Sequence, residues 1–186
     1  MRIGLISDTH IPGGATEVPS SVRRAFEGVD MILHAGNIYL PHVLDFLELI
    51  TPTKAAGGAH GDIQCDGDAR VAERLVLEVE EHTIGVIHDL MVPGFGGWVY
   101  PGSLARLIHY DGSLPIIPDN MFGKAVDIVV FGHTCTAMVE EHGGTLLINP
   151  GSPTMRNQMK KIGTVAVLDL TPHMRKVKII DLADCA

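Results

Sequence analysis

The chain is poor in basic residues and cysteines, and it lacks long apolar runs. Each shortage excludes a class of protein. Its 14 Lys and Arg residues are outnumbered by 22 Asp and Glu residues, and the net charge of −8 argues against a general nucleic-acid binder, which would present a basic face. No apolar run reaches the roughly 18 residues that span a bilayer, and Met1–His10 lacks a signal-peptide core of useful length. We therefore expect no membrane association. The 3 cysteines are far apart, so we expect no disulfide framework and a cytoplasmic location with reduced thiols.

The length and composition predict a globular protein with one core. The 186 residues suit a single domain over 1–186, and 46% of them are apolar. Short apolar runs and helical patterns alternate in the first half, which predicts parallel strands joined by crossover helices. The strands expected there are Arg2–Ser7, Met31–Ala35 and Thr53–Gly58, and the helices are Val18–Glu27 and Pro41–Ile50.

The second half has the pattern of hairpins. The expected strands are Arg74–Glu80, His82–Ile87, Asp127–Phe131, Thr136–His142, Thr145–Ile148, Thr164–Leu170 and Lys176–Leu182. Two sheets packed face to face with helices outside are the economical arrangement. Between them, residues 89–125 are rich in Gly and Pro and hold one expected short helix, Ser103–Tyr110. We expect a functional loop or lid there or, alternatively, a surface excursion or a dimer contact, which would make the protein a homo-oligomer.

Residues with metal-binding side chains recur just after the expected strands. The chain has 10 histidines, and several follow apolar runs directly. Because ligands bind beyond the carboxyl ends of strands in open α/β sheets, these positions are expected to converge on one crevice. They are Asp8-Thr9-His10, Gly36-Asn37, His60-Gly61-Asp62, His88-Asp89 and His133-Thr134-Cys135.

Taken singly, each of these motifs has a plainer explanation. Asp8 and His10 could be a helix cap and a hydrogen-bonded histidine, and Cys135 a small buried apolar residue. His34 and His42 do not follow a strand end, so we interpret both as core histidines bonded to the backbone. Five motifs at five strand ends are much harder to explain in this way, and together they indicate a metal site.

In their order along the chain these motifs resemble those of the calcineurin-like metallophosphoesterases. The resemblance covers almost the whole chain and includes a further signature, Ile148-Asn149-Pro150-Gly151-Ser152. The most similar branch contains small single-domain phosphodiesterases of bacteria and archaea, and also the small metallophosphoesterase-fold subunit of the retromer coat. The resemblance implies an α/β (α+β) fold, a four-layer αββα sandwich of two mixed sheets with two divalent metal ions at the strand ends.

The resemblance also implies roles for individual residues. Asp8, His10 and Cys135 would hold one metal. His60, His88 and His133 would hold the other. Asn37 would bridge the two, and a hydroxide between the metals would attack phosphorus in line. All of these residues are therefore candidate metal ligands, and all except Cys135 are also candidate catalytic residues.

The chain departs from the family pattern at several positions. Asn37 stands where the family usually has Asp, His60 where it has Asn, and Cys135 where it has His. Imidazole and thiolate ligands favour Mn, Fe, Zn or Ni over Mg²⁺, and a thiolate would restore the charge lost at Asn37. Gly61 replaces a histidine that often serves as general acid. Unless Asp62, Asp89 or water donates that proton, aryl or cyclic phosphodiesters are the better substrates.

We therefore predict a metal-dependent phosphoesterase, most plausibly a phosphodiesterase, that hydrolyses a small phosphorylated substrate. The alternative is a catalytically weak or inactive binding module, because the retromer subunit, chiefly a scaffold, also carries Asn at the bridging position. Many family members have His-Gly-His where this chain has His88-Asp89-Leu90, and that loss favours the same alternative. A patch formed by Phe95 and Trp98 away from the metals would favour it further. A structural zinc site is disfavoured because such sites are usually rich in Cys.

Overall fold

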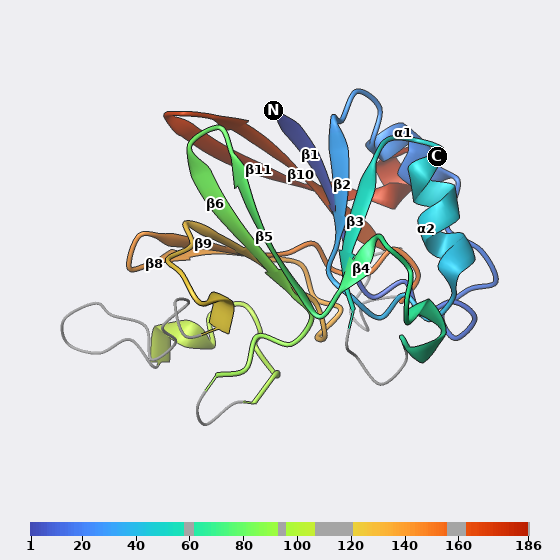
Figure 1. Ribbon diagram of the computed structural model, residues 1–186, viewed down its shortest axis with the longest axis horizontal. Helices are drawn as coiled ribbons and strands as arrows, with labels where there is room; N and C mark the ends of the chain where they lie inside the picture. Colours follow the sequence, from blue (N-terminus) through green and yellow to red (C-terminus); the bar gives the residue numbers. More distant parts are fainter. Residues whose placement is uncertain (58–61, 93–95, 107–120, 156–162, 186) are drawn as a thin grey trace.

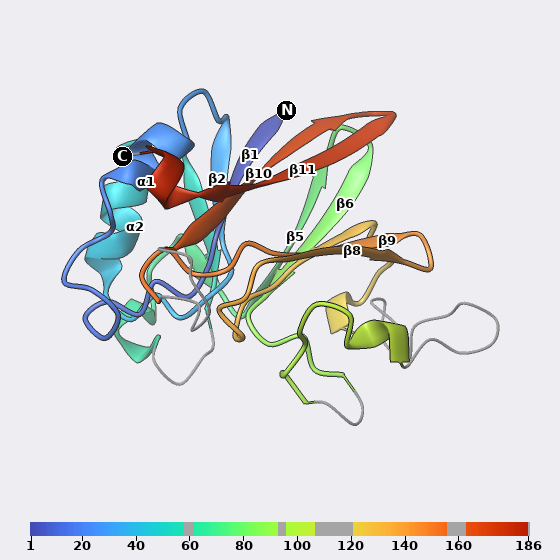
Figure 2. The same ribbon diagram turned by 180° about the vertical axis from the view of Figure 1, so that it is seen from behind.

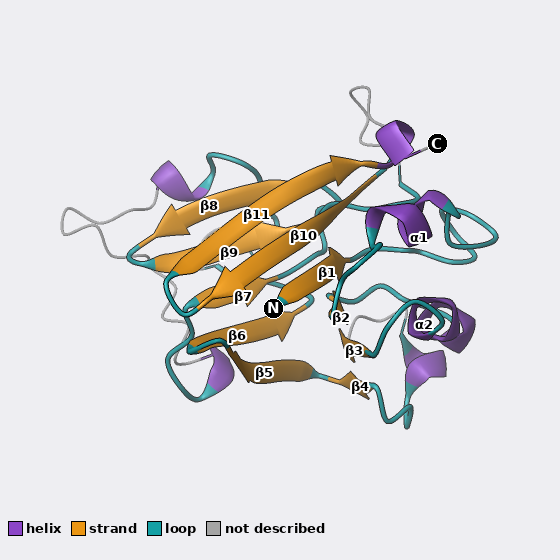
Figure 3. Cartoon of the chain, turned by 90° about the horizontal axis from the view of Figure 1, so that it is seen from above, coloured by secondary structure: helices purple, strands orange, loops and turns teal. Residues whose placement is uncertain are grey.

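The computed structural model describes residues 1–57, 62–92, 96–106, 121–155 and 163–185 (Figure 1). Its centre is a pair of mixed β-sheets packed face to face. Helices cover the outer face of one sheet, and an irregular segment covers the outer face of the other, as the view from above shows (Figure 3). None of the helices in these ranges is long and apolar enough to cross a membrane.

The first sheet has six strands in the order β11-β10-β1-β2-β3-β4. Its parallel part consists of β1 (Arg2–Ile6), β2 (Met31–His34), β3 (Thr53–Ala56) and the short β4 (Val71–Ala72). The hairpin of β10 (Thr164–Thr171) and β11 (Met174–Asp181) adds antiparallel to β1. The end of the chain therefore completes the sheet that its beginning starts.

The second sheet has five strands in the order β5-β6-β7-β9-β8. Its centre is parallel and consists of β6 (His82–Ile87), β7 (Ile128–Val130) and β9 (Thr145–Asn149). The edge strands β5 (Arg74–Val79) and β8 (Met138–His142) pair antiparallel with β6 and β9. Both sheets thus direct the carboxyl ends of parallel strands toward the loops that follow β1, β2, β6 and β7.

Apolar side chains from both sheets fill the space between them. Because successive strand residues face opposite sides, each central strand supplies one set to this core and one to its outer face. The inner set includes Ile3, Leu5, Leu33, Ile84, Val86, Ile128, Val130 and Leu168, all fully buried. This shared core fixes the two sheets, and hence the loops at their ends, relative to each other.

Helices cover the outer face of the first sheet. They are α1 (Ser21–Ala25), α2 (Pro41–Glu48) and the C-terminal 3₁₀ helix η3 (Leu182–Cys185), which lies beside α1 (Figure 2). Their buried residues Val22, Leu44 and Leu47 pack with Ile6 and Ile32 of the sheet. Pro41 at the first turn of α2 fits the position where a helix tolerates a missing N–H.

The outer face of the second sheet is covered differently. Leu90, Val92, Val99 and Leu104 from the segment after β6 are buried and pack in one cluster with Phe131 and its neighbours. Met121 and Phe122, also in this layer, are helical and follow residues 107–120, which lie outside the described ranges. The expected helix Ser103–Tyr110 begins as a 3₁₀ turn, η2 (Leu104–Arg106), and its remainder lies outside the described residues.

The predicted fold class, a mixed α/β protein with two mixed sheets, is confirmed. Most predicted strands agree with the structure to within two residues, whereas the helix predicted over Val18–Glu27 is shorter. Two features were missed. The short strand β4 follows a 3₁₀ helix, η1 (Ile63–Cys65), and the C-terminal hairpin belongs to the first sheet.

Candidate metal centre

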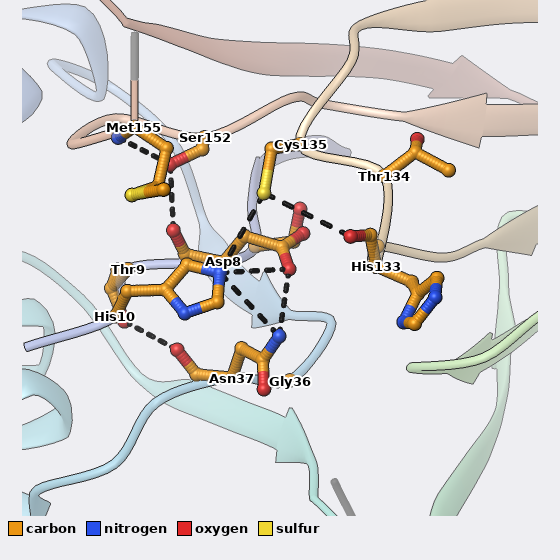
Figure 4. Close-up of polar contacts among 12 residues, drawn as sticks. Asp8, Thr9, His10, Gly36, Asn37, His133, Thr134, Cys135, Ser152 and Met155 are labelled. Carbon is orange, nitrogen blue, oxygen red and sulfur yellow. Dashed lines mark hydrogen bonds and ion pairs between the residues drawn. The ribbon is translucent and has the colours of Figure 1, made fainter. Parts of the chain in front are cut away.

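Four loops bring their polar residues together at the carboxyl ends of β1, β2, β6 and β7, and Figure 4 shows the residues that follow β1, β2 and β7. Backbone hydrogen bonds connect the loops. The N–H of Asp8 donates to Gly36 O at 2.9 Å, and the N–H of His10 donates to Asn37 O at 2.9 Å. Within the second sheet, Gly132 N–H after β7 donates to His88 O after β6 at 3.0 Å. The convergence predicted from the strand ends is therefore present.

The first cluster consists of Asp8, His10 and Cys135, whose potential ligand atoms all lie within 4.8 Å of one another. His10 Nε2 lies 3.5 Å from Asp8 Oδ1 and 3.6 Å from Cys135 Sγ. The other ring nitrogen, Nδ1, is 2.8 Å from the Tyr39 hydroxyl. A partner at Nδ1 orients the ring and leaves Nε2 directed at the cluster, as second-shell partners of metal-binding histidines commonly do.

The second cluster consists of His88, Asp89 and His133, with the same 4.8 Å limit. His88 Nδ1–H donates to Ala35 O at 2.8 Å, which leaves Nε2 free for a ligand role. His133 Nδ1 is 2.8 Å from Asp89 Oδ1, yet this buried oxygen has no hydrogen bond of acceptable geometry. A nitrogen and an oxygen this close without a hydrogen bond are placed as neighbouring ligands of one ion would be.

The residues predicted for the second metal are only partly brought together. His88 and His133 meet as predicted, but their third described neighbour is Asp89, which we had considered only as a proton donor. His60 lies outside the described residues. The Asp89 carboxylate gives this cluster a charge that three neutral histidines would lack.

Asn37 lies against the first cluster. Its Nδ2–H donates to Asp8 Oδ1 at 3.1 Å and approaches His10 Nε2 at 3.5 Å. Figure 4 shows its amide below the Asp8 carboxylate, with the His133 ring on the far side of that carboxylate from His10. A half-turn about the last side-chain bond would direct Oδ1 to the same place, so the amide can serve a cation there.

The backbone of the site is strained. Eight of the non-glycine residues that the structure describes have positive φ, and six of them lie in these loops. These are Asp8, His10, Asn37, Tyr39, His133 and Cys135, with φ between 45° and 71°. Left-handed backbone is unfavourable for residues with a Cβ, and it persists where the surroundings impose it, commonly at functional sites.

Gly132 permits the closest approach between the sheets. A Cβ at this position would lie 2.7 Å from Asp8 Oδ2, 2.8 Å from Ala35 O and 3.1 Å from His88 Nδ1. The residue that precedes His133 must therefore be glycine for Asp8 and His88 to lie near one another. Asp8 Oδ2 is itself buried and has no hydrogen-bond partner, a state that a bound cation would relieve.

Asp62 supports the site without belonging to either cluster. Its carboxylate accepts the backbone N–H groups of Asn37 at 3.1 Å, Ile38 at 2.7 Å and Tyr39 at 3.0 Å. These three hydrogen bonds hold the loop after β2 in its strained shape. Because both oxygens of this carboxylate are occupied by backbone N–H groups, its role in the structure is to hold the loop, and the interpretation of Asp62 as a proton donor is not supported.

Asn149 and Ser152 are further supporting residues that the sequence reasoning did not assign a role. Asn149 Nδ2 donates to Gly132 O at 2.7 Å and to Thr134 Oγ1 at 3.2 Å. Ser152 Oγ donates to Asp8 O at 2.6 Å. The Asn149-to-Ser152 signature was noted, and its physical role is to connect the loops that carry Asp8 and His133.

The two histidines interpreted as core residues differ. His34 is fully buried, accepts the Gly36 N–H at Nδ1 (3.1 Å) and lies 3.2 Å from Thr9 Oγ1 at Nε2, as predicted. Burial lowers its pKa to about 3, and it is therefore neutral. His42, in contrast, is exposed in the first turn of α2, so its assignment to the core was wrong.

The pKa values of Asp8 and Cys135, two residues of the first cluster, are shifted in opposite directions. Burial tends to raise the pKa of Asp8, but hydrogen bonding with His10 and the proximity of His88 outweigh it and lower the pKa below its usual value. Burial, together with the Asp8 charge, raises the pKa of the Cys135 thiol to about 12. A cation would have to displace the thiol proton, which is ordinary chemistry for a cysteine ligand.

Comparison with known proteins identifies the family. The model of the calcineurin-like phosphoesterase superfamily domain matches residues 1–173. The chain belongs to the calcineurin-like phosphoesterase superfamily. A probable metallophosphoesterase of Methanothermobacter thermautotrophicus is 33% identical over 155 residues, which cover 83% of this chain and 78% of the relative.

Solved structures of this superfamily's fold agree. Wild-type Vps29 of Entamoeba histolytica in complex with Zn²⁺ aligns with a TM-score of 0.64 at 18% identity, covering 98% of this chain and 99% of that one. A structure described as a novel archaeal phosphodiesterase aligns with a TM-score of 0.63 at 18% identity, covering 97% and 100% of the two chains. At such identities these likenesses concern the fold alone.

The ligand clusters fit what this superfamily binds. Calcineurin-like phosphoesterases bind divalent metals, and the described residues offer two groups of suitable donors. Asp8 Oδ2 is buried without a hydrogen-bond partner, and Asp89 Oδ1 has only the His133 ring beside it, so a cation would complete the surroundings of both oxygens. The donors present therefore fit the metal ions that the family implies.

Proposed function

We propose that the protein is a metal-dependent phosphodiesterase that hydrolyses small phosphate esters. The observation that carries the proposal is the pair of ligand clusters, with His133 of the second cluster on the far side of the Asp8 carboxylate from His10 (Figure 4). Asp8, His10 and Cys135 would hold one divalent ion, with Asn37 between the two sites. His88, His133 and Asp89 would hold the other, and His60 stays a proposed ligand from the sequence. Mn, Fe, Zn or Ni suits these donors.

Bound divalent ions would supply Lewis acidity, lowering the pKa of water and neutralising charge on phosphoryl oxygens. The chain's own contribution is orientation. Tyr39 and Ala35 O fix the His10 and His88 rings, and Asp62 holds Asn37 in place. Positioning of donors in advance lowers the reorganisation needed during reaction.

The proposed substrate class follows from how Asp62 and Asp89, the two carboxylates considered as proton donors, are engaged in the structure. Asp62 is engaged by three N–H groups, and Asp89 faces His133 within a ligand cluster. Leaving groups that depart without protonation, such as aryl oxides or the released oxygen of a strained cyclic diester, are therefore favoured. A cytoplasmic setting would keep Cys135 reduced and available as a ligand.

The second candidate is a binding module with a protein partner. Its support is the exposure of Met91, Trp98 and Tyr100 on the segment after β6. The Trp98 ring, however, lies 4.8 Å from the His133 ring, so this exposed side chain borders the second cluster, and Phe95, the other residue of the expected patch, lies outside the described residues. That position favours the enzyme.

The direct test is hydrolysis of bis-p-nitrophenyl phosphate by metal-free protein supplied with Mn²⁺, Fe²⁺, Zn²⁺ or Ni²⁺ in turn. We expect metal-dependent release of p-nitrophenol that His88→Ala abolishes. His173→Ala, an exposed histidine in the β10–β11 turn, is the matched control and should leave the rate unchanged. No release with any metal would move the conclusion to the binding module.

A further inference from the structure

The chain contains 1 Trp, and this residue is exposed beside the second cluster. Trp98 is 57% exposed, and its ring meets His133 at a centroid distance of 4.8 Å and an interplanar angle of 64°. The edge of one ring meets the face of the other, so much of the indole surface remains open to solvent next to a proposed metal ligand. Tryptophan is a large apolar side chain that folding normally covers.

Trp98 is exposed although hydrogen bonds and a buried neighbour hold the backbone beside it. Val99, the next residue, is fully buried in the outer core, and its N–H donates to Gly97 O at 2.9 Å. Before it, Val92 and Gly96 form an antiparallel bridge with two hydrogen bonds of 2.9 Å. The backbone on both sides of Trp98 is therefore fixed.

Gly97 allows this backbone to approach the cluster. A Cβ at Gly97 would lie 3.1 Å from His133 Cδ2 and 3.3 Å from Asp89 Oδ1, closer than most side chains tolerate. The segment is packed against the ligands as tightly as its sequence permits. Its next side chain, the indole, consequently projects over the edge of the cluster.

Beyond Trp98 the segment is anchored again. Ser103 Oγ accepts the Tyr100 N–H at 3.1 Å, and Gly102 N–H donates to Glu140 Oε1 of β8 at 2.6 Å. Leu104 is fully buried. An apolar platform held rigidly at the rim of a phosphate-binding centre is suited to a flat apolar group carried by the substrate, because little ordering is needed on binding.

We propose that Trp98 is a substrate-binding residue that stacks on an aromatic group, an aryl ring or a nucleobase, carried by the phosphate ester. The inference rests on the proposed function, since it assumes that phosphate binds at the clusters. An aryl or nucleoside ester carries its ring a few bonds from phosphorus, the same order of distance as separates the indole from His133. Stacking on a tryptophan accepts many ring types, and truncation of such a platform typically weakens binding about tenfold.

The lone tryptophan makes the proposal testable without turnover. In protein loaded with Zn²⁺ alone, phenyl phosphate should quench the Trp98 fluorescence in a saturable way. Methyl phosphate, with the same charged group and no ring, should bind with little quenching and about tenfold more weakly. Equal responses to the two phosphates would overturn the stacking role whether or not the protein is an enzyme.

Kinetics with diesters of one leaving group provide the second test. The pair is p-nitrophenyl phenyl phosphate and p-nitrophenyl methyl phosphate, assayed with the wild type, Trp98→Ala and Trp98→Phe. We expect Trp98→Ala to raise KM about tenfold for the phenyl diester with little change for the methyl diester, and Trp98→Phe to restore most of the difference. Leu49→Ala, which truncates an exposed apolar residue at the end of α2, is the matched control.

The outcomes separate the two proposals. Loss of activity toward both diesters in Trp98→Ala would show that the residue supports His133 and does not bind substrate, which overturns the inference. Absence of turnover by the wild type together with selective phenyl phosphate quenching would refute the proposed enzyme and retain the aromatic subsite. Because Trp98 is largely exposed, its truncation leaves no core cavity, and thermal denaturation should confirm that the variant folds.

Discussion

The two ligand clusters differ in how they are built and in what they need before a metal can bind. The first cluster, Asp8, His10 and Cys135, joins the first sheet to the loop after β7 and includes a thiol whose pKa is raised to about 12. The second cluster, His88, Asp89 and His133, comes from the second sheet alone and contains no thiol. Metal binding at the first cluster must displace a proton from sulfur, whereas the second offers imidazole and carboxylate.

This difference indicates a division between the two sites. The second cluster should accept a wider range of divalent metals, and the first should prefer ions with an affinity for thiolate, such as Zn²⁺. Within one crevice the chain would then hold two ions of unequal affinity. Each of the following predictions tests this contrast.

The largest effect is expected from His133→Ala. The side chain of His133 is half-buried and belongs to the second cluster, so its loss should reduce phosphodiesterase activity at least about a hundredfold and remove one bound metal, leaving the first cluster loaded. Metal content after gel filtration, measured by mass spectrometry, checks the second half of the prediction. Loss of both metals would show that the clusters bind as one unit and that the contrast is false.

Cys135→Ser should weaken the first cluster about ten- to a hundredfold for Zn²⁺ and hardly change the second. In the Co²⁺-loaded wild type, a sulfur-to-cobalt charge-transfer band is expected in the near ultraviolet, and the variant should lack it. Cys185→Ser, a half-buried thiol in η3, is the control and should retain the band. A Co²⁺ spectrum identical in wild type and Cys135→Ser would show that the thiol is not a ligand.

The same thiol predicts a dependence of affinity on pH. Because the raised pKa keeps Cys135 protonated at neutral pH, binding must release that proton, and Zn²⁺ affinity at the first cluster should rise up to about tenfold per pH unit. Isothermal titration in buffers of different ionisation enthalpy measures the released protons. In Cys135→Ser one fewer proton should be released, and an unchanged count would contradict the assignment.

Asp62→Ala should destabilise the loop that places Asn37 beside the first cluster. Three backbone N–H groups lose their acceptor, and since Ile38 is fully buried we expect a loss of about 2–4 kcal/mol in the free energy of unfolding. Urea denaturation of the metal-free protein measures it, with Asp62→Asn expected to lose less because one oxygen remains. Unchanged stability with a lost alkaline limb in the pH–rate profile would instead restore Asp62 as a proton donor.

Much of the centre could be predicted from the sequence because each ligand follows a strand and parallel strands end at a common edge. Asp8, His10, His88, His133 and Cys135 meet for that reason. The pattern of apolar runs also predicted that the strands form two sheets packed face to face. What it could not give was the sheet to which the last hairpin belongs, because β10 pairs with β1 across the whole length of the chain.

Other parts of the site depend on contacts between loops that no spacing reveals. Asp62 holds Asn37, and Asn149 holds Gly132, through hydrogen bonds whose partners are separated by 25 and 17 residues. Asp89 joins the second cluster because the chain turns at His88, a direction that periodicity does not encode. Trp98 was noted for its exposure, but its place over His133 depends on how closely Gly97 approaches the ligands.

The smallest effect concerns the support behind the first cluster, where buried His34 connects Gly36 to Thr9. Its pKa falls from 6.5 to about 3 on folding because of burial, so below pH 6.5 the unfolded chain binds a proton that the folded protein excludes. The contribution of neutral His34 to the free energy of unfolding is complete above pH 6.5 and is lost as the pH falls toward 3. The loss between pH 7 and pH 5 should amount to about 2 kcal/mol. In metal-free protein, His34→Gln should lack this part of the pH dependence of unfolding by urea, and an equal dependence in both proteins would show that His34 is not held neutral behind the first cluster.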